Sequence, residues 1–323
     1  MRWMLPLALS VGLSLPAAGR AVEQGTVTFE PVGEQTRVPE RYRLEKHHFD
    51  YDLEFKRDLP GCDVDVFTLR FPSPVKSPEP ENNTVWAEYY RPRGAGPFPA
   101  VIVLDITGGD QMVSRIISTH LAQNGIAGLF VQMAYYGPRR PPGSRVRLLS
   151  ADYQHTMEAV RQTVLDLRRA AAWMASRAEL DGKRLGILGT SLGSFMGSLT
   201  AEMEPRLSRV AVLLGGGGLV DAYYDDPRAK VVRQLWETFG GSKEKLKKMI
   251  APADPLTCAA NLKDRNVLMI VAKHDEIVPP QMAEALWKAS GQQRIVWMDS
   301  GHYTAVFYIV PALGHIVRHF GSE

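Results

Sequence analysis

The chain has 323 residues, of which 45% are hydrophobic and 23% are charged. This composition is typical of a globular protein with a substantial core, and the length allows one large α/β domain or two ordinary ones. The formal net charge is +3, and no cluster of Lys and Arg is interleaved with aromatic residues. The composition therefore gives no reason to expect a nucleic-acid partner.

The first residues have the features of a secretory signal peptide. Arg2 supplies a positive start, Met4–Leu15 is apolar, and small residues follow it as a cleavage region. The apolar stretch is too short to span a bilayer. We expect residues 1–21 to be a signal peptide and the protein to be exported, to the periplasm or the medium, with no stable membrane span. In such an oxidising compartment Cys62 and Cys258 either pair or remain as two free thiols.

Residues 22–63 are mixed and polar, and we expect an N-terminal extension that packs on the main domain. The main domain is expected over residues 64–323. Apolar or alternating segments there predict about eight strands, at residues 64–71, 84–92, 98–106, 126–133, 183–189, 208–216, 266–273 and 293–299. Helical spacing predicts helices at residues 114–125, 155–178 and 304–320. The alternation indicates an α/β fold, a mostly parallel sheet with helices on both faces.

The longest interval between consecutive predicted strands is residues 219–262. Apolar residues in this interval, among them Val231, Leu235 and Phe239, recur at helical spacing. Two interpretations are open. The segment is either a small lid over the carboxyl ends of the strands, with Trp236 lining an acyl pocket, or a surface helix packed on the domain.

Ser191 lies in a Gly-x-Ser-x-Gly pattern with Gly189 and Gly193. The pattern follows a predicted strand and precedes a run with helical character, which is the context that a nucleophilic serine on a sharp turn requires. The flanking glycines permit close approach of strand and helix. At the head of that helix the backbone N–H of Leu192 is free to stabilise an oxyanion. The alternative is an ordinary serine in a glycine-rich turn.

A nucleophilic serine needs a histidine base and an acid that orients the base, and in this arrangement they follow the serine in the order acid, histidine. Asp275 directly follows one predicted strand, and His302 follows the next. Other candidates for the acid are Glu276, Asp221, Asp225 and Asp226, and other candidates for the base are His274, His315 and His319. His315 and His319 are four residues apart, but the glutamate of the zinc-protease motif is missing, so we expect no metal site.

These residues resemble the catalytic positions of the α/β-hydrolase superfamily. The resemblance rests on Ser191 in GTSLGS, Asp275 in KHDEIVP and His302 in SGH, and it extends from about residue 64 to the C-terminus. Within the superfamily the chain looks most like the dienelactone-hydrolase and acetyl-xylan-esterase-like branch, which includes exported bacterial members. The resemblance implies a second oxyanion donor in the loop after the third strand, the backbone N–H of Thr107 or Gly108.

Residues 132–145 follow the fourth predicted strand, on the rim where substrates bind in such folds. Tyr135, Tyr136 and Arg139 are candidates for contact with a carbohydrate or an acidic group. A solvated rim with no contact to substrate is the alternative.

The main hypothesis is a serine esterase that needs no cofactor. It would cleave a small-molecule or carbohydrate-linked carboxylic ester through an acyl-enzyme on Ser191, with His302 as base and Asp275 as orienting acid. Two alternatives are a serine peptidase of prolyl-oligopeptidase type and a catalytically inactive binding protein on a hydrolase fold. Residues 22–63 are too few for the large extra domain that such peptidases usually carry, so the esterase is preferred.

Overall fold

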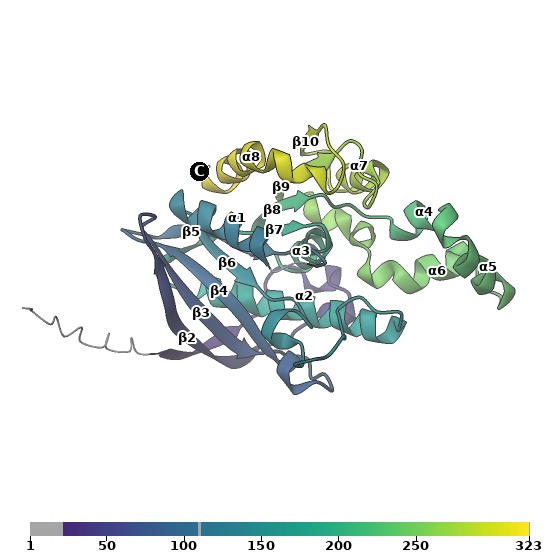
Figure 1. Cartoon of the computed structure of the whole chain (residues 1–323). Coiled ribbons are helices and arrows are strands. Elements are labelled where there is room, and N and C mark those ends of the chain that lie inside the picture. Colours follow the sequence, from purple (N-terminus) through teal and green to yellow (C-terminus); the bar gives the residue numbers. More distant parts are fainter. Residues whose placement is uncertain (1–21, 109–110, 323) are drawn as a thin grey trace, which may run out of the picture.

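The computed structural model describes residues 22–108 and 111–322, and within them ten strands form one mixed sheet (Figure 1). The predicted signal peptide lies outside the described residues. The strands are β1 (Glu23–Phe29), β2 (His47–Leu59), β3 (Val64–Pro72), β4 (Thr84–Pro92), β5 (Phe98–Leu104), β6 (Ala127–Val131), β7 (Leu180–Thr190), β8 (Leu207–Leu213), β9 (Asn266–Ala272) and β10 (Arg294–Met298). Their order in the sheet is β1-β2-β3-β4-β6-β5-β7-β8-β9-β10.

The sheet has an antiparallel part and a parallel part. Strands β1 to β4 pair antiparallel, as do β4 and β6. From β6 through β5 and β7 to β10 every pairing is parallel. The α/β prediction is confirmed, and each strand predicted from residue 64 onward is present. Because β5, β7, β8 and β9 are buried on both faces, their sequences are nearly continuous apolar runs.

The prediction of about eight strands was too low, because the segment 22–63 supplies β1 and β2 to the same sheet. Strand β2 carries an alternation that was not predicted as a strand. Phe49 and Leu53 are buried against the core, whereas Asp50 and Glu54, which directly follow them in the chain, are exposed. Period-two alternation of this kind is the pattern of a strand with one solvated face.

Helices cover both faces of the sheet. They are α1 (Met112–Gln123), α2 (Tyr153–Ala175), α3 (Leu192–Met203), α4 (Leu219–Tyr223), α5 (Lys230–Thr238), α6 (Lys243–Ile250), α7 (Pro280–Ala289) and α8 (Ile309–Gly321). Buried side chains of α1 and α8 join one hydrophobic cluster, and those of α2, α3 and α7 join another on the opposite face (Figure 1). Helix α8 begins at Ile309 rather than residue 304, because Pro311 is tolerated only in the first turn of an α-helix.

The first part of the interval 219–262 forms an arm, defined here as α4 to α6, that projects from the body at the right of Figure 1, whereas Ala259 and Leu262 at its end are buried in the core. Gly240, with a φ of +78°, separates α5 from α6. The Ser242 hydroxyl then caps α6 by accepting the backbone N–H of Lys245.

Two further findings bear on the class of protein. In the described part of the chain, no helix combines the length and the hydrophobicity needed to cross a bilayer. Cys62 and Cys258 are both free thiols, and the Cys62 sulfur accepts a hydrogen bond from the Gln123 amide (3.0 Å).

Candidate active site

Ser191 occupies the turn between β7 and α3. Its backbone has φ +52° and ψ −118°, a conformation that is strained for any residue with a Cβ. The turn is held in place because the N–H of Ser191 donates to the carbonyl oxygen of Leu213, at the end of the neighbouring strand (2.9 Å). Strain at a single residue between a buried strand and a buried helix is typical of a site where one side chain must be presented outward.

Steric crowding explains why the motif has glycine on both sides of Ser191. A Cβ on Gly189 would lie 2.0 Å from the carbonyl oxygen of Gly193. A Cβ on Gly193 would lie 2.5 Å from the carbonyl oxygen of Asp105, which follows β5. Both contacts involve backbone atoms, which cannot move aside, so the close packing of β5, β7 and α3 requires glycine at both positions.

The structure brings Ser191, His302 and Asp275 into one chain of hydrogen bonds. The Ser191 Oγ lies 3.1 Å from the Nε2 of His302, and the His302 Nδ1 lies 2.8 Å from Oδ2 of Asp275. The Asp275 side chain is 1% exposed, and its Oδ1 also accepts the backbone N–H groups of Ile277 and Val278. With Nδ1–H donating to this fixed carboxylate, Nε2 is oriented to accept the hydroxyl proton of Ser191.

The other candidate acids have different partners. Glu276 accepts the backbone N–H of His302 (3.1 Å) rather than its imidazole. The remaining three carboxylates form ion pairs with basic residues of the arm: Asp221 with Lys247, Asp225 with Lys243 and Asp226 with Arg228.

The other candidate histidines lie away from Ser191. His274 pairs with Asp299 (3.0 Å), and the His315 Nδ1 lies 2.9 Å from the Arg294 guanidinium. His319 is buried in α8, where loss of solvent lowers the pKa of its imidazole to about 4. Among the described residues, no three His, Cys, Asp or Glu side chains gather where a metal ion could be held.

Two backbone regions beside Ser191 contain the N–H groups expected to stabilise an oxyanion. Leu192 is the first residue of α3, so its N–H has no acceptor within that helix. In the loop after β5, Ile106 already donates its N–H to the Asp105 carboxylate (2.7 Å). Thr107 and Gly108 line the same cavity as Ser191, and they remain the candidates for a second donor.

Ser191 and His302 open into a cavity of about 670 Å³ whose wall is mostly apolar. Its described lining comprises Ile106, Thr107, Gly108, Val113, Ile117, Thr190, Ser191, Leu213, Leu214, Ile270, Ile277, Met298, His302, Tyr303, Ala305, Val306, Ile309 and Ala312. This wall was not predicted from the sequence. It is assembled from α1, the ends of β8 to β10 and the start of α8, and no contiguous stretch of sequence shows it.

The residues expected to bind substrate are placed elsewhere. Arg139 is 0% exposed and forms a buried ion pair with Asp166 (2.7 Å), so it does not lie on the rim as expected. Tyr135 is also buried, and its hydroxyl donates to the Glu79 carboxylate (2.9 Å). Both residues hold the loop after β6 against the body of the protein.

The two remaining candidates also lie outside the described cavity lining. Tyr136 donates its hydroxyl to the Thr107 carbonyl oxygen (2.6 Å), so it holds the loop after β5 rather than lining the cavity. The Trp236 indole N–H donates to the Ser242 carbonyl oxygen (3.1 Å) within the arm. No residue of 219–262 lines the cavity, so in this structure the arm does not cover it.

Two family models match the chain, and each covers just over half of it. The model of the Prolyl oligopeptidase family matches residues 152–320, and that of Alpha/beta hydrolase domain containing 18 matches residues 51–217. The chain belongs to the α/β-hydrolase superfamily. An uncharacterized protein of Mycobacterium tuberculosis H37Rv is 27% identical over 159 residues, which are 47% of this chain. The matched part spans about a third (35%) of the length of the curated relatives.

Solved structures show which α/β hydrolases share this architecture. An acetyl xylan esterase from Paenibacillus sp. R4 superposes with a TM-score of 0.66 at 17% identity, over 83% of this chain and 88% of that one. Acetyl xylan esterase 1 from Thermoanaerobacterium sp. JW/SL YS485 gives 0.61 at 18% identity, over 83% and 87%. A putative dienelactone hydrolase from Klebsiella pneumoniae gives 0.52 at 17% identity, over 94% and 100%. At 17–18% identity, these neighbours show that the chain shares their fold.

Proposed function

We propose that this α/β hydrolase is a serine esterase that cleaves carboxylic esters of small molecules or carbohydrates through an acyl-enzyme on Ser191. The observation that carries the proposal is the hydrogen-bond chain from Ser191 through His302 to the buried Asp275, at the mouth of a mostly apolar cavity. Every group that the chemistry needs is supplied by side chains and backbone N–H groups, so the proposed reaction needs no cofactor.

The proposed reaction has two halves. The His302 Nε2 takes the hydroxyl proton while Ser191 Oγ attacks the carbonyl carbon, and the carbonyl electron pair moves onto oxygen. The N–H of Leu192 and that of Thr107 or Gly108 stabilise this oxyanion. Its collapse expels the alcohol, which receives the proton from His302. Water then repeats the sequence on the acyl-enzyme and releases the acid.

A serine peptidase is the second candidate, and the match to the Prolyl oligopeptidase family model favours it. The same three residues would serve either reaction, because both pass through an acyl-enzyme. The esterase is preferred because the solved neighbours with the highest TM-scores reported above are esterases. An inactive binding protein is disfavoured by the hydrogen-bonded distances among all three side chains.

Hydrolysis by the wild type and by Ser191→Ala tests the proposal. We expect the wild type to hydrolyse p-nitrophenyl butyrate and to react with a fluorophosphonate probe, and Ser191→Ala to do neither. Cleavage of an alanyl-prolyl p-nitroanilide in preference to the butyrate would support the peptidase. A wild type that is inert to every substrate and to the probe would support the binding protein.

We further propose that the protein acts outside the cytoplasm, because residues 1–21 have the charge and hydrophobic pattern of a signal peptide. Expression of the full chain followed by N-terminal sequencing of the mature protein checks this. A mature chain that begins near residue 22 is expected, whereas an intact first segment in the cytoplasmic fraction would contradict export.

A further inference from the structure

We propose that the substrate is an uncharged ester with a long apolar chain, and that this chain lies between α1 and α8. The inference rests on the proposed ester hydrolysis at Ser191 and specifies its substrate class. Three independent features of the cavity carry it, namely its depth between the two helices, its volume and the absence of cationic side chains from its described wall.

The cavity reaches from Ser191 into the apolar layer between the sheet and the helices α1 and α8. Its floor is made by residues at the ends of β8, β9 and β10, Leu213, Ile270 and Met298, and each is less than one-tenth exposed. Ile117 of α1 and Ala312 of α8 both line this cavity, one from each helix. A chain that enters there would exchange water for aliphatic surface along its whole length.

The volume exceeds what a short acyl group requires. Pockets of roughly 300–1,000 Å³ enclose drug-sized ligands, and this cavity holds about 670 Å³. An acetyl group would leave most of that space to water in contact with apolar walls. Each methylene that replaces this water is expected to improve kcat/KM about threefold to fourfold, until the chain reaches the end of the cavity.

The described wall contains no Lys or Arg. A carboxylate on the substrate would therefore lose its hydration without gaining a cation in return, which is strongly unfavourable. An apolar chain pays no such penalty.

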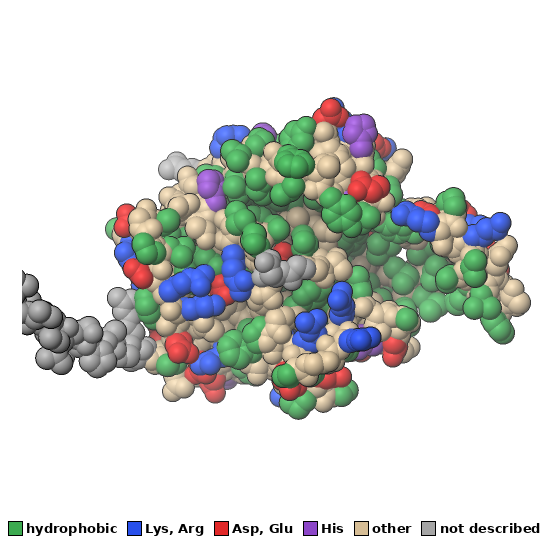
Figure 2. Space-filling view, in the orientation of Figure 1, with side chains coloured by type: hydrophobic (Ala, Val, Ile, Leu, Met, Phe, Trp, Pro, Cys, Tyr) green, Lys and Arg blue, Asp and Glu red, His purple; other side chains and the backbone are tan. Residues whose placement is uncertain are grey.

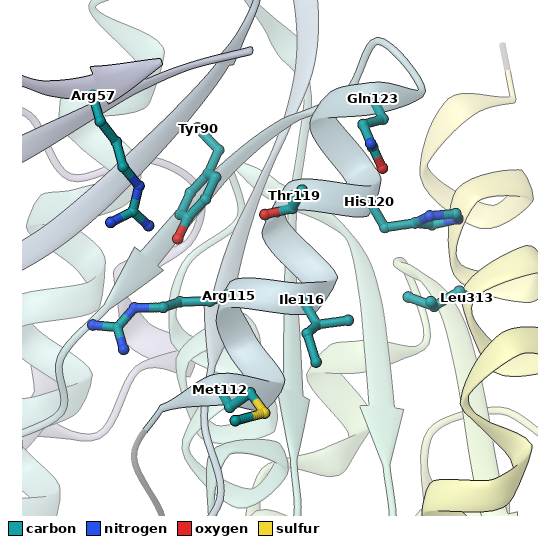
Figure 3. A pocket seen from close by; sticks show the side chains of 9 residues that line it. All are labelled: Arg57, Tyr90, Met112, Arg115, Ile116, Thr119, His120, Gln123 and Leu313. Atoms are coloured by element: carbon teal, nitrogen blue, oxygen red, sulfur yellow. The ribbon is translucent and has the colours of Figure 1, made fainter. Parts of the chain in front are cut away.

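A groove on the outer side of α1 shows the contrast (Figure 3). This groove, of about 470 Å³, is lined by Arg57, Arg115 and His120 together with apolar side chains. Helix α1 therefore presents basic and polar groups away from Ser191, while Val113 and Ile117 line the cavity beside it. The chemistry next to the nucleophile thus favours an uncharged chain.

The apolar surface continues outside the cavity. Tyr303, Val306 and Phe307 are 71%, 62% and 82% exposed, and the first two also line the cavity. Figure 2 shows hydrophobic side chains gathered on this part of the molecule, around α8 and β10. A chain longer than the cavity would lie on this surface.

Two ester series test the proposal with the purified mature enzyme. One series is p-nitrophenyl acetate, butyrate, hexanoate and octanoate, and the other is alkyl acetates from ethyl to octyl. We expect kcat/KM to rise about threefold to fourfold per methylene in at least one series. The half-ester mono-p-nitrophenyl adipate, compared with the hexanoate, is expected to react at least about 100-fold more slowly.

A cavity-filling variant links the chain-length preference to this cavity. The measured quantity is the ratio of kcat/KM for the longest ester to kcat/KM for the shortest ester, in the series that shows the chain-length preference. Ala312→Leu is expected to lower this ratio by at least about tenfold. Val310→Leu is the matched control, because Val310 is 75% exposed on the same helix and is not among the described lining residues. It is expected to leave the ratio unchanged, and thermal unfolding shows whether each variant is folded.

The outcomes separate the substrate class from the proposed function. The apolar-chain inference is wrong if hydrolysis depends on Ser191 but kcat/KM does not change with chain length in either series. It is also wrong if kcat/KM for the adipate half-ester equals that for the hexanoate. In both cases the proposed esterase function is unaffected. An unchanged ratio in folded Ala312→Leu also overturns the inference. If the wild type hydrolyses no ester in either series and no fluorophosphonate labels it, the proposed function itself fails.

Discussion

The carboxylate of Glu276 accepts a hydrogen bond from the backbone N–H of His302 (3.1 Å). Asp275, its neighbour in the chain, contacts the imidazole of the same histidine. Adjacent acids thus hold the backbone and the ring of one residue, and a Cβ on Gly301 would lie only 2.7 Å from the Glu276 carboxylate. We infer that Glu276 is a positioning residue that sets the place of the histidine loop.

Glu276→Ala is therefore expected to lower kcat about fivefold to tenfold with KM nearly unchanged, since it removes one hydrogen bond to a charged acceptor. Glu276→Gln retains an acceptor oxygen and is expected to restore most of kcat. Steady-state kinetics on one ester for both variants checks this. If both variants lose kcat equally, the negative charge matters rather than the hydrogen bond, and if neither changes kcat, Glu276 does not position His302.

Asp275→Asn should have a far larger effect. The amide cannot stabilise the imidazolium, and loss of an orienting aspartate in an unrelated serine hydrolase lowers kcat about 10⁴-fold. We expect a decrease of about 10³-fold to 10⁴-fold here. Asp221→Asn is the control, because Asp221 pairs with Lys247 in the arm and should leave kcat within about twofold. Comparable losses in the two variants would contradict the assignment of the acid.

The sequence predicted the strands from residue 64 onward and the order of Ser191, Asp275 and His302, because each strand is a short apolar run with turn residues after it. It could not show which side chains of the loop after β6 face solvent. Arg139 points inward because Asp166, on the neighbouring helix α2, offers a buried carboxylate. This ion pair is a tertiary contact, and the sequence around Arg139 does not indicate it.

The cavity wall was missed for a related reason. Ile117, Met298 and Ala312 come from three elements that are distant in the chain, and each has the pattern of an ordinary core position. Strand β2 is different, because its alternation was present in the sequence and was overlooked among many charged residues.

The buried pair of Arg139 and Asp166 yields a test of stability. Arg139→Ala leaves the carboxylate of Asp166 without its cation, which is expected to cost about 3–5 kcal/mol of the free energy of unfolding. Urea denaturation measures the loss, and Arg140→Ala, at an exposed neighbouring site, is expected to change stability by no more than about 0.5 kcal/mol. A folded Arg139→Ala of wild-type stability with a raised KM would instead indicate contact with substrate.

His319 makes the stability of the protein depend on pH in the acid range. Loss of solvent, with the nearby Arg209 guanidinium as a second cause, lowers the pKa of its imidazole to about 4. Between pH 6.5 and pH 4 the imidazole is therefore protonated in the unfolded chain but neutral in the native state. Stability should be full above pH 6.5 and should fall by about 1.4 kcal/mol per pH unit between pH 6.5 and pH 4.

Urea denaturation of the wild type and of His319→Gln across this range measures the effect. The variant has no titrating group at this position, so its stability should depend less steeply on pH. Parallel pH profiles for the two proteins would show that His319 does not contribute.

Glu202, in α3, predicts the opposite pH dependence. Its side chain is buried, and desolvation, followed by the negative charge of Asp254, raises the pKa of the carboxyl well above 4.5. Neither carboxyl oxygen has a hydrogen-bond partner among the described residues. The native state thus keeps a proton that the unfolded chain releases above about pH 4.5, so this residue should lower stability as pH rises above that value.

Glu202→Gln removes the titration and keeps the shape. At pH 8 the variant should therefore be more stable than the wild type, because only the wild type must keep in the native state a proton that its unfolded chain has released. Near pH 4 the difference should vanish. Glu204→Gln is the control, because Glu204 forms ion pairs with Arg168 (3.2 Å) and Arg206 (2.7 Å) and its loss should destabilise the protein at pH 8. If Glu202→Gln is also destabilised at pH 8, the prediction is wrong. The Glu202 carboxylate would then be charged in the native state and stabilised by a partner group.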